Sequence, residues 1–382
     1  MNSKERVQAC IDRRPVDAVP LGFYLVDHDI ISRVIGRPTY VRNNIATNLA
    51  YWEGRRDEVV ESMKADVVDF YRKIDLCDII TFKEACLVPP KGHQPEPVKK
   101  IADDCWEDAS GRVYQISAVS NEFVCVKNPT IQDRVWTPEE FLAPLAVTPP
   151  DPSIFEVYDV MVSGLAADRY VAGVTAGFGL TLMLGGMERG LIECALNPEA
   201  VRAAMHRQVV YQNAMDGYYL RPGLGGAFIE SDMSSTRATL ISPAMWRDLF
   251  RDEVRSRVAS LRARGLQVLM HSCGNTLELM EEFIDAGVQC YQSIQNIPEM
   301  WVGDLKQRFG DRLVLWGGMP VEELVLGTPQ SVRAAVRRAM EAAAPGGGFI
   351  LGPSHSVAYG TKYENFMAML DEFSRLRHRF AG

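Results

Sequence analysis

The sequence predicts an α/β protein built on parallel strands, and three observations support this. In the carboxy-terminal half, short apolar runs alternate with amphipathic helices that carry start and stop residues. This unit repeats at a spacing of about 20–35 residues, as expected for right-handed crossovers between parallel strands. The length of 382 residues fits one large barrel with additions, and a composition of 47% hydrophobic and 24% charged residues supplies a packed core. A barrel and a doubly wound sheet both satisfy these observations.

Helix starts are marked most clearly after residue 240. Ser242 is a cap residue followed by proline at the first helical position, and Gly265 ends the apolar stripe that follows. Asn275 with Glu278 fits a capping box at the start of the next helix. Further starts are predicted at Asn296 with Glu299, at Thr328 with Pro329, and at Thr361 with Glu364.

Strands are predicted where short apolar runs lie between helices and turn residues. Gly317 and Gly318 are expected to turn the chain after one of them. The count of nine exceeds by one the eight strands of a barrel, so one of these predictions has to be wrong. The predicted strands are 19–25, 67–71, 79–82, 170–174, 226–230, 266–271, 288–292, 313–316 and 349–351.

Between residues 84 and 150 the helical period disappears. Stretches 111–116 and 122–126 are typical of antiparallel hairpin strands, and prolines bracket the segment. We interpret it as a β-rich insertion into a single domain of residues 1–382, placed where it covers the mouth of the barrel.

Composition excludes several classes of function. The formal charge of −8 and the lack of any basic run argue against a nucleic acid or an anionic membrane as partner. The longest uncharged run, 170–187, contains five glycines and would make a poor membrane helix. The eight cysteines form no C-x-x-C pair, which is typical of a reducing compartment, and the amino terminus resembles no signal peptide. We therefore expect a cytosolic enzyme with a small-molecule substrate.

Reactive groups in parallel α/β folds lie where strands end. Glu230 ends one predicted strand and Asp232 follows it, while His271 ends another and Cys273 follows. Gln292 closes the strand after that. Glu230, Asp232 and Gln292 are therefore predicted catalytic residues.

His271 and Cys273 are predicted metal ligands. Residues two apart in an extended segment point the same way and lie about 6.6 Å apart, so both side chains can reach one ion. Imidazole and thiolate together favour Zn²⁺. The alternative is that His271 is a hydrogen-bonded core histidine and Cys273 an inert thiol. His355, also after a strand, is the candidate third ligand, and Glu230 either completes the set or carries a proton beside the metal.

Other polar groups have simpler explanations. Asp27, His28 and Asp29 follow the first strand and look like ligands, but Asp27 also suits a helix cap. Tyr24 is a possible apolar wall residue for a methoxy-aromatic substrate, although such residues are more often plain core. Phe82 and Trp106 fall in the same class.

Five stretches, in order along the chain, resemble the uroporphyrinogen decarboxylase superfamily, which includes zinc-dependent methyltransferases of corrinoid systems. This resemblance implies a (β/α)₈ TIM barrel with its site at the carboxyl ends of the strands. Gly317, Gly318 and Ser354, in the last two stretches, are predicted to contact the cofactor. The stretches are 6–22, 240–245 (Leu-Ile-Ser-Pro-Ala-Met), 271–275 (His-Ser-Cys-Gly-Asn), 316–319 (Trp-Gly-Gly-Met) and 347–355.

The resemblance also implies a zinc site, with one departure. The methyltransferase branch holds zinc with a histidine, a cysteine two residues later, and a second cysteine near the final strand. His271 and Cys273 match, but the third position lacks a cysteine, so His355 with Glu230 would complete the set. The decarboxylase branch carries an arginine-rich stretch after the first strand, and residues 23–29 contain no arginine. This argues against porphyrinogen decarboxylation.

Three functions follow as hypotheses. The first is methyl transfer between a small O- or S-methyl compound or thiol and a corrinoid (methylcobalamin), with Zn²⁺ as Lewis acid and the corrinoid delivered by a partner protein. The second is a metal-free decarboxylase or lyase that binds an acid through Arg72, Lys73 or Lys83. The third is a non-catalytic corrinoid-binding or small-ligand-binding protein.

Overall fold

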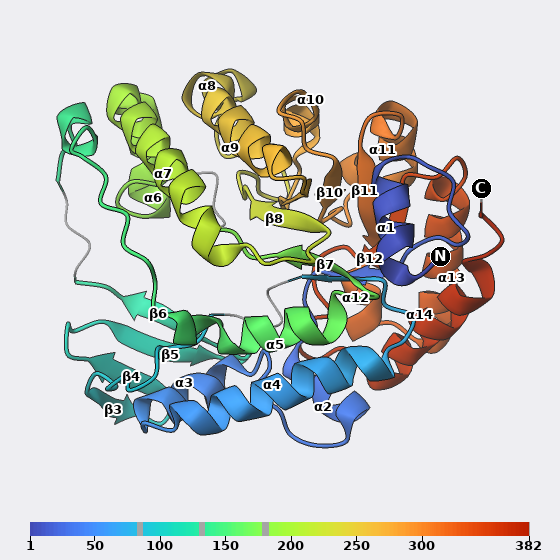
Figure 1. Cartoon of the computed structure of the whole chain (residues 1–382), viewed down its shortest axis with the longest axis horizontal. Helices are drawn as coiled ribbons and strands as arrows, with labels where there is room; N and C mark the ends of the chain where they lie inside the picture. Colours follow the sequence, from blue (N-terminus) through green and yellow to red (C-terminus); the bar gives the residue numbers. More distant parts are fainter. Residues whose placement is uncertain (82–86, 130–133, 178–182, 382) are drawn as a thin grey trace.

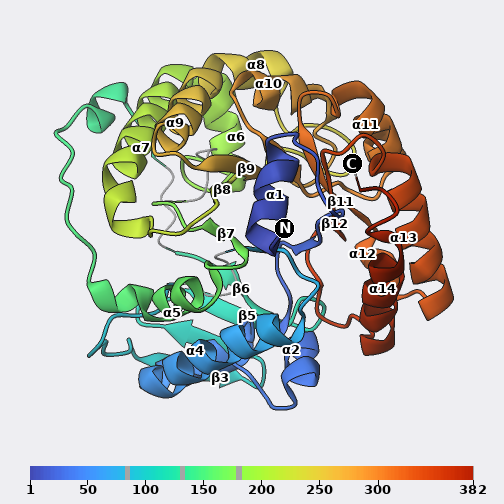
Figure 2. The same ribbon diagram turned by 45° about the vertical axis from the view of Figure 1, so that its right-hand side comes forward.

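A computed structural model describes residues 1–81, 87–129, 134–177 and 183–381. Its centre is a parallel sheet whose eight strands follow one another in the order of the chain, apart from the inserted strands β3–β6. The first and last strands also meet, because the Leu351 N–H donates to the Pro20 carbonyl at 3.0 Å. The sheet therefore closes into a barrel, as predicted (Figures 1 and 2). The strands are β1 (Gly22–Phe23), β2 (Ile79–Thr81), β7 (Tyr170–Gly173), β8 (Gly226–Glu230), β9 (Gln267–His271), β10 (Cys290–Gln292), β11 (Val314–Met319) and β12 (Phe349–Pro353).

Helices connect the strands and surround the central sheet (Figure 2). The α-helices are α1 (Ser3–Ile11), α2 (His28–Ile35), α3 (Asn44–Trp52), α4 (Arg56–Lys73), α5 (Glu156–Leu165), α6 (Met187–Leu196), α7 (Pro198–Tyr219), α8 (Pro243–Leu249), α9 (Arg251–Ala263), α10 (Met280–Asp285), α11 (Val302–Phe309), α12 (Val321–Val325), α13 (Pro329–Ala343) and α14 (Tyr363–Leu376). The 3-10 turns are η2 (Pro138–Phe141), η3 (Pro152–Phe155), η4 (Leu277–Leu279) and η5 (Pro298–Met300).

A second sheet of four antiparallel strands is inserted after β2. It contains both predicted hairpin strands, now β5 and β6, and two that the sequence did not predict, β3 and β4. Because it follows the carboxyl end of β2, it lies on the side of the barrel where parallel strands end, away from both termini (Figure 1). The predicted bounds of the insertion, 84–150, begin among residues outside the described part of the chain and stay a prediction. The strands are β3 (Val98–Ala102), β4 (Cys105–Asp108), β5 (Val113–Ser117) and β6 (Glu122–Lys127).

The tip between β5 and β6 touches the loops at the barrel mouth. The side chains of Asn121 and His28 lie 2.8 Å apart, and Asn44 Nδ2 donates to Glu122 Oε1 at 2.7 Å. Arg42 adds an ion pair to Glu122 at 3.6 Å. The insertion therefore borders the mouth, and the prediction that it covers the mouth stays a prediction.

One predicted strand is wrong. Residues 67–71 lie inside helix α4, and this removes the ninth strand. Within α4 the side chains of Val60, Met63, Val67 and Phe70 are all buried. Their spacing of three and four residues is that of one helix face. The run 67–71 is too short to show this spacing when it is considered alone.

Some predicted helix starts are confirmed and others are not. Ser242 and Thr328 cap α8 and α13 through their side chains. Asn275, Asn296 and Thr361 are not the caps that were predicted, because the capping positions are Thr276, Ile297 and Lys362. The Asn275 side chain accepts the Leu277 N–H at 3.4 Å and also donates to the Arg237 carbonyl, and the Asn296 side chain donates to Glu322.

The barrel interior beneath the site is filled by aromatic side chains. Trp316 is fully buried, and its indole N–H donates to the Gly22 carbonyl at 3.1 Å. Phe228 meets Trp316 edge to face, with 6.0 Å between ring centroids. A Cβ at Gly22 would lie 1.9 Å from Ile79 Cγ2, so only glycine allows this packing. The interior is thus a packed core that supports the strand ends above it.

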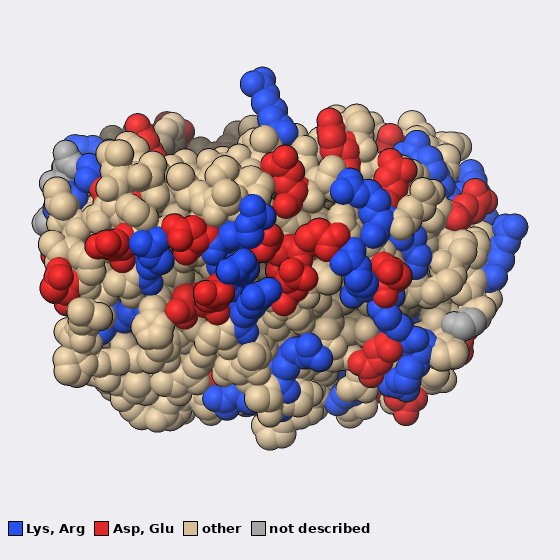
Figure 3. Space-filling view, turned by 90° about the horizontal axis from the view of Figure 1, so that it is seen from above, with Lys and Arg blue, Asp and Glu red and all other residues tan. Residues whose placement is uncertain are grey.

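The surface mixes charges of both signs. On the face shown in Figure 3, acidic and basic side chains are interspersed without a field of one sign. Among the helices that the structure describes, none is both long and apolar enough to cross a bilayer.

Candidate metal centre

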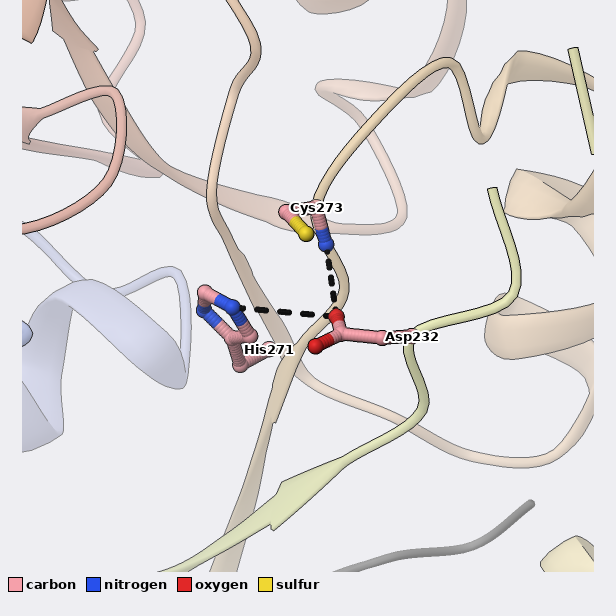
Figure 4. Close-up of side chains that lie close together, drawn as sticks. All are labelled: Asp232, His271 and Cys273. Atoms are coloured by element: carbon pink, nitrogen blue, oxygen red, sulfur yellow. Dashed lines mark hydrogen bonds and ion pairs between the residues drawn. The ribbon is translucent and has the colours of Figure 1, made fainter. Parts of the chain in front are cut away.

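Three potential metal ligands converge at the carboxyl ends of two neighbouring strands. Glu230 ends β8 beside His271, which ends β9, so Asp232 and Cys273 follow at the same edge. One ligand atom from each of Asp232, His271 and Cys273 lies within 4.8 Å of the other two. Figure 4 shows the imidazole, the sulfur and the carboxylate around one space. The prediction that His271 and Cys273 share one site agrees with this geometry.

Contacts within the group fix its shape. His271 Nε2 lies 3.7 Å from Asp232 Oδ1, and the Cys273 N–H donates to the same oxygen at 2.9 Å. His271 is buried, Cys273 half-buried and Asp232 exposed, so the group opens on the Asp232 side. Burial, followed by the charge of Asp232, raises the pKa of the Cys273 thiol to about 12.

Gln292 sets the orientation of the His271 ring. It pairs with His271 in the parallel register of β9 and β10, and its Oε1 lies 2.5 Å from His271 Nδ1. Its Nε2 donates to the His355 carbonyl at 3.4 Å, which turns the amide oxygen toward the imidazole. Nδ1 therefore carries the proton, and the lone pair of Nε2 faces Asp232.

Tyr24 forms the opposite wall of the site. Its ring stacks on that of His271, with 4.1 Å between centroids and 9° between planes. Its hydroxyl donates to Glu230 Oε1, so Glu230 turns toward Tyr24. Burial and then the charge of Glu230 raise the pKa of Tyr24 well above its usual range. The phenol therefore keeps its proton and holds the carboxylate in place.

His355 borders the group without being one of its three members. Its ring meets that of His271 edge to face at 5.3 Å, and its Nδ1 lies 3.2 Å from Ser356 Oγ. A ligand role for His355 stays a prediction, as does one for Glu230.

The loop that carries Cys273 is held from several sides. The Tyr291 hydroxyl donates to the Ser272 carbonyl at 2.6 Å, and the Asn275 N–H donates to the Ser235 carbonyl at 2.7 Å. Gly274 has φ +88°, and a Cβ there would lie 2.7 Å from the Ser235 oxygen. Only glycine lets the loop after β9 pack so closely against the loop after β8.

The predicted cofactor residues have structural roles. Gly317 and Gly318 do not turn the chain after β11 but continue it, paired with Leu351 and Gly352. Ser354 Oγ accepts the N–H of Val321 at the start of α12. Cofactor contact by Gly317, Gly318 and Ser354 stays a prediction.

Asp27, His28 and Asp29 join two loops of the mouth. Asp27 is at the capping position of α2, but its carboxylate accepts the N–H of Tyr359, and Asp29 accepts that of Gly360. The acidic pair thus ties the loop after β1 to the loop after β12.

Of the predicted wall residues, Tyr24 lies at the site and Trp106 packs in the four-stranded sheet against Phe123. Phe82 lies outside the described residues, as does Lys83.

Arg72 and Lys73 lie at the wrong end of the barrel to bind a substrate at this site. They end α4, which leads into the amino end of β2. Arg72 pairs with Asp168 at 2.7 Å, and Lys73 with Asp69 at 3.3 Å. The two cations proposed for acid binding are therefore held in ion pairs on the side opposite the strand carboxyl ends.

Sequence reasoning missed two contacts. It did not place the Asp232 carboxylate beside His271 and Cys273, where it lies; the catalytic role predicted for Asp232 stays a prediction. It treated Tyr24 as a wall only and missed the bond to Glu230. Asp232 follows the end of β8 by two residues, as Cys273 follows the end of β9, and this shared position could have placed Asp232 in the group. The hydrogen bond between Tyr24 and Glu230 joins residues 206 positions apart, and no local sequence pattern predicts it.

Comparisons with known proteins agree with the architecture. The chain is similar to a solved methyltransferase from Methanosarcina mazei, with a TM-score of 0.65 and 15% identity over 98% of this chain and 99% of that one. A GH18 chitinase from Flavobacterium johnsoniae shares 11% identity over 58% of this chain and 79% of its own, with a TM-score of 0.33. This TM-score is too low to support a structural inference. No curated protein matches the chain.

The family model for uroporphyrinogen decarboxylase (URO-D) matches residues 122–376, which is more than half of the chain. The match includes β8, β9 and β10, the strands that carry Asp232, His271, Cys273 and Gln292. The protein therefore belongs to the uroporphyrinogen decarboxylase family.

Proposed function

We propose that the protein is a zinc-dependent methyltransferase that moves a methyl group between a small O- or S-methyl compound or thiol and a corrinoid. The observation that carries this proposal is the convergence of Asp232, His271 and Cys273 at one opening of the barrel mouth. Similarity to a methyltransferase fold and family membership agree with methyl transfer in the broad sense.

The three donors fit Zn²⁺ in type and orientation. A thiolate, an imidazole nitrogen and a carboxylate oxygen are all common zinc ligands, and catalytic zinc usually keeps three protein ligands and one open position. A ligating histidine usually donates its other ring N–H to a neighbouring acceptor, which is the role of Gln292 Oε1 here. The exposed side of Asp232 leaves room for the open position.

Bound Zn²⁺ would supply a Lewis acid that stabilises the oxygen or sulfur anion from which, or to which, the methyl group moves. In this proposal Glu230, held by the Tyr24 hydroxyl, takes a proton from a substrate thiol or returns one to a leaving oxygen. Tyr24 also covers one face of His271 and keeps water from that side of the ring. These residues orient the donors and handle the proton, while the methyl group passes at the open side.

In this proposal the corrinoid reaches the open side on a partner protein. A cytosolic location, expected from the cysteine pattern, belongs to the same proposal.

An assay with free methylcobalamin tests the reaction. Zinc-loaded protein should demethylate methylcobalamin in the presence of one of a panel of small thiols, or methylate cob(I)alamin from one of a panel of methoxy or methylthio compounds. The absorbance change of the corrinoid reports both directions. Release of carbon dioxide from a carboxylated compound without metal or corrinoid would replace the proposal by the decarboxylase, and tight cobalamin binding without methyl movement would replace it by a binding protein.

Replacement of Gln292 by alanine should weaken zinc binding by about 10–100-fold, because the His271 ring loses the acceptor that fixes its proton on Nδ1. Competition with a chromophoric chelator measures the affinity. Gln295→Ala is the control, since Gln295 follows the same strand but makes no bond to His271. Equal zinc affinity of the Gln292→Ala variant and the wild type would remove Gln292 from the site.

Asp232 and His355 compete for the place of third ligand, and two variants separate them. Structural zinc sites bind with about 10–16 kcal/mol over four ligands, so the loss of one ligand costs on the order of 3 kcal/mol, or roughly 100-fold in affinity. Asp232→Ala should show this loss, and His355→Ala should retain affinity within a few-fold. The reverse result in the same chelator competition would assign the third ligand to His355.

A further inference from the structure

A second cleft lies in the inserted sheet, between it and helix α3. Its volume is about 500 Å³, and its aromatic lining comes from Tyr51 and Trp52 of α3 and from Tyr114 and Phe123 of the sheet. None of Asp232, His271 and Cys273 lines it. We call it the aromatic cleft.

The rings form a continuous wall that the protein leaves half-open. The Trp52 ring lies 5.0 Å from that of Phe123 and 6.2 Å from that of Tyr114, between centroids. All four aromatic side chains are half-buried, whereas the aromatic residues of the barrel interior are fully buried. The cleft thus offers ring faces that no described part of the chain covers completely.

The charges beside this wall have a negative balance. Asp108 and Arg112 pair at 2.7 Å, so they cancel. Glu96 also lines the cleft and is exposed, and within the described ranges no ion pair involves it. With His93 neutral, the two carboxylates and one guanidinium of the lining give the cleft a net formal charge of −1, and Glu96 interacts with Arg112 through its charge.

Two aromatic rings of the inserted sheet already lie beside cations of the protein itself. Lys100 Nζ lies 5.5 Å from the Trp106 ring centroid, and Arg112 Cζ lies 5.9 Å from that of Tyr114. Among the described residues, no lysine or arginine lies over the Trp52 ring as these two lie over Trp106 and Tyr114. The rings of Trp106, Tyr114 and Phe123 contact the Trp52 ring, which is half-buried and so keeps an accessible part for a cation from outside the chain.

The Asp108 carboxylate has little capacity left to accept further hydrogen bonds. Asp108 Oδ1 already accepts three bonds, from the N–H and hydroxyl of Ser110 and from the Arg112 N–H. Its Oδ2 accepts from the Arg112 side chain and the Tyr114 hydroxyl. A primary ammonium could donate to Glu96 but not to Asp108, whereas a quaternary ammonium has no N–H to satisfy and interacts with the cleft through its charge and the ring faces alone.

We propose that the aromatic cleft binds an organic cation through a quaternary, fully N-alkylated ammonium group, with the charge on the Trp52 face and beside Glu96. The cleft lies on the same side of the barrel as the metal group, since the insertion leaves from the carboxyl end of β2. The inference does not depend on the proposed methyl transfer, because no residue of the cleft takes part in that chemistry.

Three small probes test the proposal on the full-length protein by calorimetry, with tryptophan fluorescence as a second signal. Choline carries the quaternary charge, 3,3-dimethyl-1-butanol is its neutral isostere, and ethanolamine is its primary analogue. Choline should bind at least about 10-fold more tightly than either. Equal binding of the isostere would overturn the proposal in favour of an apolar cleft, and binding of none of the three would overturn it outright.

Matched variants locate the site. Glu96→Gln should weaken choline binding several-fold. Glu107→Gln is the control and should not change it, because Glu107 belongs to β4 of the inserted sheet and does not line the cleft. Trp52→Leu should abolish binding, and Glu96→Gln keeps the test valid if that variant does not fold. Tighter binding of benzoate than of choline, lost in Arg112→Gln, would overturn the proposal in favour of an aromatic acid. Zinc content, measured on the same samples, should be unchanged in every variant.

Discussion

The His271→Ala, Cys273→Ala double variant should contain no zinc and should lose methyl transfer by more than about 100-fold. Two of the three converging donors disappear, and Asp232 alone is an exposed carboxylate without a partner ligand. Metal analysis after dialysis measures the loss, and the wild type should hold about one zinc per chain.

A control variant removes the same residue types elsewhere. His206→Ala, Cys125→Ala takes away an exposed histidine of α7 and an exposed cysteine of β6. It should retain full zinc content and activity. If the site variant keeps its zinc while its circular dichroism matches that of the wild type, the metal lies elsewhere.

Asp216→Asn should destabilise the fold by about 3–5 kcal/mol. Asp216 of α7 and Arg257 of α9 are fully buried, and the two guanidinium nitrogens Nη1 and Nη2 donate to the two carboxylate oxygens. Asp216 also accepts the Ala176 N–H at 3.2 Å, which holds the loop after β7. The variant leaves the Arg257 charge buried without its counter-ion, and urea denaturation measures the change in the free energy of unfolding.

The exposed pair between Arg202 of α7 and Asp248 of α8 is the matched control. Asp248→Asn should cost about 0–1 kcal/mol, because solvent screens that pair. The double variant Asp216→Leu, Arg257→Met should recover much of the loss, since it removes both buried charges. A loss for Asp216→Asn as small as that for Asp248→Asn would mean that water reaches the pair.

The barrel could be predicted because its signals are local and repeat. Ser242 and Thr328 cap helices that their own residues specify, and strands 226–230 and 266–271 match β8 and β9 closely. Two of the helix caps that were predicted wrongly involve side chains that bind partners distant in the sequence. Asn275 and Asn296 have the capping pattern, yet Arg237 and Glu322 bind their side chains, and no local rule contains such contacts.

The candidate site was predictable to the level of strand ends. His271 ends β9 and Cys273 follows it by two residues, so their spacing alone placed them together. The places of Asp232, Glu230 and Tyr24 depend on the register of different strands and on which way each carboxylate turns. The sequence alone could not favour Asp232 over His355 as the third ligand, because it does not give the position of the loop after β8.

Zinc K-edge X-ray absorption of the purified wild-type protein reports directly on the ligands of the bound metal. We expect one zinc with a single sulfur neighbour at about 2.3 Å and nitrogen or oxygen neighbours at about 2.0–2.2 Å, and the sulfur shell should vanish in Cys273→Ala. Protein that carries no zinc, or zinc without a sulfur neighbour, would contradict the metal centre at Asp232, His271 and Cys273.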